Sequence, residues 1–221
     1  MSDLSTRLAP EQLSSVYLRL VADESIPQEA REQQFGYLRR LATDLLVGLA
    51  LDGPESVRVL DDRDVAGFGW GELSAAGRAN LLAEPVDYQT IDLPEGAVLH
   101  LLGHPESVFA ASKLLVFEEA VRAAGGPELP DEGVLLVAPN RHNLVFYPLA
   151  DGHVGEAVNS LAMFAQGAYE DGPGRLSPRV FWWRAGELLS ITHFDPETRT
   201  ASIVPPEELM GIIRRLAGVA G

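Results

Sequence analysis

Apolar positions recur at helical spacing in the first part of the chain. Between Pro27 and Gly53-Pro54 they predict one long helix. The apolar positions of this helix are Phe35, Leu38, Leu41, Ala42, Leu45, Leu46 and Leu49. A shorter helix is expected to open at Pro10, a strand is expected over 57–60, and another helix over 72–82. This part of the chain is therefore expected to be mainly helical.

From residue 85 onwards, short apolar runs alternate with amphipathic segments. Turns join most of the runs in pairs, which predicts antiparallel strands. The expected strands are 86–93, 97–102, 133–138, 144–149, 179–184, 187–193 and 200–204. The expected helices are 107–124, 154–168 and a last one after Pro205-Pro206. Helices between hairpins need a sheet face to cover, so the predicted fold class is α+β, with a mostly antiparallel sheet built from hairpins, helices packed on it, and N-terminal helices.

The length of 221 residues fits a single domain, 1–221. A chain of this size buries most of its surface without disulfides or metals. The change of pattern suggests a subdivision into a mainly helical part, 1–84, and an α+β part, 85–221.

The chain is strongly acidic, with 32 acidic and 17 basic residues and a formal net charge of −15. Lys113 is its only lysine, and Ala, Gly and Pro are abundant, which is typical of a GC-rich bacterial genome. The charge argues against binding to a nucleic-acid backbone, which needs clustered Lys and Arg. It is consistent with a solvated surface, with a nucleic-acid mimic, or with an antitoxin-like protein that binds a basic partner. The solvated surface is the simplest interpretation.

The chain contains no cysteine, which excludes thiol nucleophiles and cysteine-ligated metals. Its longest apolar runs are too short to span a membrane, and no signal peptide is recognised at Met1. We therefore expect a cytoplasmic protein without membrane association.

Local motifs for catalysis and metal binding are incomplete. His100 and His104 would need a third metal ligand, for which the acidic run 61–64 is the nearest candidate, and their spacing fits a helix that Gly103-His104-Pro105 cannot form. By itself the run 61–64 lacks the glycine and distal glutamate of a calcium loop. No Gly-x-Ser-x-Gly elbow occurs, and the glycines over 67–71 lack the lysine of a phosphate-binding loop. We accordingly expect no catalytic residue, no metal site and no cofactor, although distant loops can assemble a histidine or carboxylate site without a local trace.

An aromatic hairpin is the most informative local feature. If Ala185-Gly186 forms a two-residue turn, Trp183 faces Leu188 and Trp182 faces Leu189. One face then carries Val180, Trp182, Leu189 and Ile191 and is the better core face. The other face carries Arg179, Phe181 and Trp183, which suits a protein interface or a ligand-contacting wall. The alternative, which the number of helices favours, is that helices cover both faces. A bulged turn at Ala185 would exchange the faces.

Two loops carry the remaining candidate binding residues. Arg141 and His142 belong to the loop 139–143, and Arg175 belongs to the loop 172–178. If both loops lie at the same end of the sheet, these side chains could bind an anion.

Several segments resemble the bacterial YtpQ-like family of unknown function, over about residues 70–195. They are Trp70 with the helix after it, Ala111–Leu115, Leu135–His142, Met163-Phe164 and Gly186–Leu188. The family has no assigned reaction, so the resemblance implies a shared fold and no functional residues.

Three functions remain open. The first is a non-enzymatic, protein-binding or regulatory module, acting on another protein or by self-association. The second is an enzyme or small-molecule-binding protein with a cleft lined by Arg141, His142 and Arg175. The third is an immunity or antitoxin-type protein that binds a basic partner.

Overall fold

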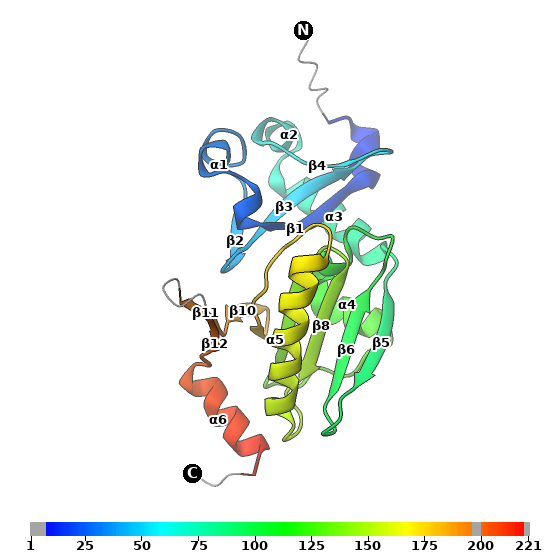
Figure 1. Ribbon diagram of the computed structural model, residues 1–221. Coiled ribbons are helices and arrows are strands. Elements are labelled where there is room, and N and C mark those ends of the chain that lie inside the picture. Colours follow the sequence, from blue (N-terminus) through cyan, green and yellow to red (C-terminus); the bar gives the residue numbers. More distant parts are fainter. Residues whose placement is uncertain (1–7, 196–199, 219–221) are drawn as a thin grey trace. The chain divides into compact units, whose positions relative to one another are not determined.

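The computed structural model describes residues 8–195 and 200–218 (Figure 1). The chain divides into two compact units, Met1–Glu84 and Pro85–Gly221, which are described separately.

The first unit contains a sheet centred on β3. Its strands are β1 (Val16–Ala22), β2 (Arg39–Ala42), β3 (Leu45–Asp52) and β4 (Val57–Val59), all paired antiparallel to β3. β1 pairs with β3 from Val16↔Leu51 to Ala22↔Leu45 and so occupies one edge. β2 and β4 therefore share the other edge of β3.

The long helix predicted between Pro27 and Gly53-Pro54 is wrong. Only α1 (Gln28–Gln34) is helical there, and the hairpin of β2 and β3 follows it. β3 is buried along most of its length on both faces. Its sequence is therefore a continuous run of apolar residues, without the alternation of apolar and polar positions seen in a strand with one exposed face. Periodicity alone does not separate such a strand from a buried helix. The helix expected at Pro10 is a 3-10 helix, Pro10–Ser15, that leads directly into β1.

One helix of the first unit, α3 (Trp70–Ala83), comes into close backbone contact with the sheet. α2 (Asp62–Phe68) and α3 follow β4, and a short 3-10 helix, Asp23–Ser25, follows β1. A β-carbon on Gly77 would lie 2.7 Å from Leu18 N, so only glycine lets α3 come this close to β1. The amide of Asn80 donates to Leu13 O (2.8 Å) and Val16 O (2.7 Å) and fixes the same contact.

The second unit is built on a six-stranded antiparallel sheet of order β10-β9-β7-β8-β6-β5. The strands are β5 (Asp87–Asp92), β6 (Val98–Gly103), β7 (Val134–Asn140), β8 (Asn143–Pro148), β9 (Phe181–Arg184) and β10 (Glu187–Ser190). A separate hairpin pairs β11 (Thr192–Asp195) with β12 (Thr200–Ile203). The predicted α+β class with a mostly antiparallel sheet is confirmed.

Helical segments cover both faces of this sheet. α5 (Val154–Asp171) runs along one face, and α6 (Glu207–Leu216) joins the same core through Leu209 and Ile212 (Figure 1). A 3-10 helix, Ala110–Val116, and α4 (Phe117–Ala123) cover the other face. On that side the Phe117 ring meets Phe146 edge-on, with ring centroids 5.1 Å apart.

Candidate functional site

The hairpin of β9 and β10 has the predicted register. Trp183 pairs with Leu188 and Trp182 pairs with Leu189. The two-residue turn is made by Ala185 (φ 49°) and Gly186 (φ 84°). Positive φ at both central residues matches the twist of the flanking strands.

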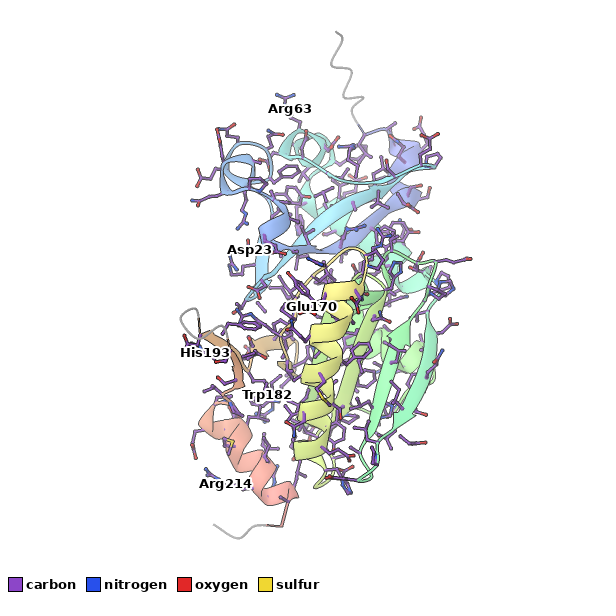
Figure 2. The ribbon with its side chains drawn as sticks, in the orientation of Figure 1. Asp23, Arg63, Glu170, Trp182, His193 and Arg214 are labelled. Atoms are coloured by element: carbon purple, nitrogen blue, oxygen red, sulfur yellow. The ribbon has the colours of Figure 1, made fainter. Side chains whose placement is uncertain are left out.

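One face of this hairpin belongs to the core under α5. Val180, Trp182 and Ile191 are part of that core, whereas Leu189 remains 48% exposed. The indole N–H of Trp182, labelled in Figure 2, donates to Glu132 O at 2.9 Å. Trp182 therefore anchors the loop before β7.

The other face is covered by α4, as favoured from the sequence. Phe181 is completely buried, so it is a core residue with no surface for a ligand. Trp183 is 8% exposed and packs edge-on against Phe117 at 5.1 Å. Arg179 donates to Thr192 O (2.7 Å) and lies over the Phe194 ring, so its guanidinium has a structural role.

A pocket of about 610 Å³ lies beside Trp183. It is lined by Glu118 and Arg122 of α4, by the segment 126–131, and by Trp183 and Ala185 of the hairpin. This volume is within the range of ligand-binding pockets, about 300–1,000 Å³. Of the predicted binding residues, Trp183 is the one that lines it.

The charges of this pocket are uncompensated. Its titratable side chains are Glu118, Arg122, Glu128 and Asp131, three carboxylates and one guanidinium. All four are exposed, and within the described residues we find no ion pair or hydrogen bond made by their side chains. The pocket therefore combines an aromatic wall with charges available to a ligand.

The segment 126–131 is held against the hairpin by its backbone. Arg184 Nε donates to Asp131 O at 2.9 Å, and Gly133 N donates to Pro130 O at 2.9 Å. Gly133 has a φ of 88°, a conformation that favours glycine. These contacts keep the wall of the pocket in place.

The loops 139–143 and 172–178 do come together. Arg141 N donates to Gly174 O (3.0 Å), and Leu176 N donates to Pro139 O (2.9 Å). The buried Asn140 amide donates to Ala168 O (2.9 Å) at the end of α5. The two loops thus form one end of the second unit.

The side chains of Arg141, His142 and Arg175 are used within the protein. His142 Nδ1 is 2.9 Å from Ser107 O, so it carries the proton and donates. In the neutral ring Nε2 then accepts from Arg141 Nε at 3.0 Å. Arg175 Nη2 donates to Glu170 O (2.8 Å), and its guanidinium lies over the Tyr169 ring.

A hollow of about 370 Å³ adjoins His142. It is lined by Asp87, Gln89, Leu101, Gly103, His104, Pro105, His142 and Asn143, and neither arginine is among its lining residues. Of the three predicted side chains, His142 therefore lines this hollow, and Arg141 and Arg175 do not.

The histidines and the acidic run considered for metals have other partners. His100 Nδ1 is 2.6 Å from the Tyr88 hydroxyl, and His104 Nδ1 accepts from Ser107 N at 3.1 Å. In the run 61–64, Asp61 caps α2 by accepting from the amides of residues 63 and 64. Among residues 8–195 and 200–218, no group of three or more such side chains is close enough to hold a metal ion.

The charged residues of the pocket were missed by the sequence analysis. Glu118, Arg122, Glu128 and Asp131 carry no local motif, because α4 and the following loop meet the hairpin only in the tertiary structure. The available signal was the segment Gly125–Pro130, which has two glycines and two prolines directly after a helix.

The fold and the site define an α+β protein with two compact units and a ligand-sized pocket in the second. Comparison of the chain with protein-family models, curated proteins and solved structures gives no match. Within the part of the chain that the structure describes, no helix has the length and apolar character needed to cross a membrane.

Proposed function

We propose that this chain is a non-enzymatic binding protein that holds a basic segment of another protein in the pocket beside Trp183. The observation that carries the proposal is the pocket itself, in which an almost buried tryptophan lies among three unpaired carboxylates. An aromatic wall with carboxylates around it favours an arginine or lysine side chain, through cation–π contact and charge.

The overall charge supports the same class of partner. The formal net charge of −15 attracts a basic partner and speeds its encounter with the pocket. The pocket lies at the end of α4 and at a hairpin turn, so an extended segment can reach it from solvent.

The lining of the pocket supports binding rather than catalysis. Its residues include no hydroxyl, thiol or imidazole side chain, which are the usual nucleophiles and proton-transfer groups. A pair of carboxylates can act as acid and base in some reactions. The three carboxylates of this pocket, however, are all exposed to water.

The test is the binding of a short amidated peptide with two arginines, measured by calorimetry at low salt. The double variant Glu118→Gln, Asp131→Asn should bind it about three- to tenfold more weakly, because it removes two of the three pocket carboxylates. The matched control, Glu106→Gln with Asp92→Asn, removes two exposed acids outside the pocket and should change the affinity less than twofold. Equal affinities of the two double variants, or no binding at all, would reject the proposal.

Other functions proposed from the sequence relate to this one in different ways. An immunity or antitoxin-type protein would be one form of it, with a basic toxin as the partner. A small-molecule cleft of Arg141, His142 and Arg175 has less support, since their polar atoms already have partners. Self-association, a cytoplasmic location and the relation to the YtpQ-like family remain proposals.

A further inference from the structure

We infer that the pocket takes the C-terminal residue of its partner, an arginine or lysine whose α-carboxylate is held by Arg122. The inference rests on the proposed function and adds which part of the partner enters. A residue at a chain end carries a carboxylate and a side-chain cation together, whereas an internal residue carries only the cation. The pocket offers a counter-charge for each.

Arg122 differs from the other arginines of the second unit. Each of the others in the described residues donates at least one hydrogen bond; they are Arg141, Arg175, Arg179, Arg184, Arg214 and Arg215. For Arg122 we find no acceptor among residues 8–195 and 200–218, although it lines the pocket. Its planar fork of donors is therefore free to bind a carboxylate with two hydrogen bonds.

Glu118 and Arg122 lie one turn apart on α4. Glutamate four residues before a basic residue is the favourable order for an ion pair on a helix. The two side chains do not form that pair among the described residues, and both line the pocket. Separate positive and negative groups along one wall match a ligand that carries both charges.

Trp183 supplies the third contact. Its side chain is more than nine-tenths buried, and in the described part of the chain no acceptor is found for its indole N–H. The neighbouring Trp182 donates from the same atom to Glu132 O, so a free donor is not general for this hairpin. The ring provides a surface for the side-chain cation, and its N–H provides a donor for the carboxylate or the last carbonyl.

An internal basic segment fits these groups less well. Arg122 would repel its cation, and the Arg122 guanidinium and the Trp183 N–H would gain no anionic partner. Capture of a terminal carboxylate is an established mode of peptide recognition. The apolar part of the lining, Pro127, Leu129 and Pro130, is available to the residues that precede the chain end.

The experiment compares two forms of one peptide, acetyl-Gly-Ser-Gly-Gly-Arg, with a free C-terminal carboxylate or with an amide. Calorimetry on the full chain should give about tenfold tighter binding of the acid form. Arg122→Gln should weaken the acid form about tenfold. It should not weaken the amide form, for which Arg122 is only a repulsive charge, so that the preference disappears. Glu118→Gln should weaken both forms by a similar factor, because it removes a partner of the side-chain cation.

The outcomes separate this inference from the proposed function. Equal binding of acid and amide, with both weakened by Glu118→Gln, would overturn the inference and leave the proposed function standing. If neither peptide binds, the inference and the proposed function are both overturned. Binding of free arginine as tightly as the acid peptide would also overturn the inference, since the ligand would then be a small zwitterion rather than a chain end. Arg122 and Glu118 are exposed, and unchanged thermal unfolding of the variants would show that the fold is retained.

Discussion

Gly133 lies directly against the backbone of Trp183. A β-carbon on Gly133 would come within 2.2 Å of the Trp183 carbonyl oxygen, and the φ of Gly133 is 88°. This contact joins the loop that walls the pocket to the strand that carries the tryptophan. It is therefore a point where local backbone geometry sets the shape of the site.

We expect Gly133→Ala to lower the free energy of unfolding by about 3 kcal/mol or more. The substitution adds the cost of a left-handed conformation to a clash with a rigid carbonyl group. The control is Gly125→Ala, since Gly125 has a φ of 76° but open space around it, and it should cost only about 1 kcal/mol. Chemical denaturation measures both, and equal losses would show that the contact with Trp183 is unimportant.

Ala185→Gly should stabilise the protein by about 0.5–1 kcal/mol. Ala185 has a φ of 49°, which costs about 1–2 kcal/mol for a residue with a β-carbon, and the added freedom of glycine in the unfolded chain offsets part of the relief. Ala123→Gly in the exposed last turn of α4 should have the opposite sign. The denaturant midpoints of the two variants measure these changes in stability. A loss of stability in Ala185→Gly would contradict the prediction that the positive φ of Ala185 strains the turn.

Glu156 connects α5 to the turn between β5 and β6. Its carboxylate accepts from Glu95 N (2.6 Å) and Ala97 N (2.9 Å). Glu156→Gln should destabilise by about 1–2 kcal/mol, because the amide has one acceptor oxygen and turns a donor toward the second N–H. The matched variant Glu95→Gln keeps the backbone contacts and should change the unfolding free energy by less than about 0.5 kcal/mol. Similar losses for both variants would argue against the bidentate contact.

The stability of the protein should depend on His100 at mildly acidic pH. Burial lowers the pKa of His100 below its ordinary value of 6.5. The unfolded chain therefore binds a proton at a higher pH than the folded one, and the contribution of His100 to stability falls as the pH drops through 6.5 toward the folded pKa. Unfolding free energies at pH 7, 6 and 5 should fall less steeply for His100→Gln than for the wild type. His153→Gln, which replaces an exposed histidine, is the control, and an unchanged slope in His100→Gln would contradict the prediction.

The sequence predicted the second unit well and the first unit poorly. Turns such as Ala185-Gly186 and the strand runs around them are local, so the register of Trp183 opposite Leu188 follows from the residues alone. The run from Leu45 to Leu51 has no such alternation, because β3 is buried on both faces. Its partners β1 and β2 also lie in segments whose apolar spacing fits helices, and no local feature separates the two interpretations.

What the sequence determined by itself was the α+β class, the hairpins of the second unit and the strong negative charge, all of which depend on composition or on neighbours along the chain. Only the tertiary structure decided that Phe181 is buried while Trp183 lines a pocket, although both were predicted on one face. It also decided that Glu118, Arg122 and Asp131 come together around that tryptophan. The physical reason is that exposure and charge grouping are set by the contacts of α4 and the loop after it, 126–131, with the β9–β10 hairpin. The hairpin lies dozens of residues further along the chain, so these contacts leave no periodic signal.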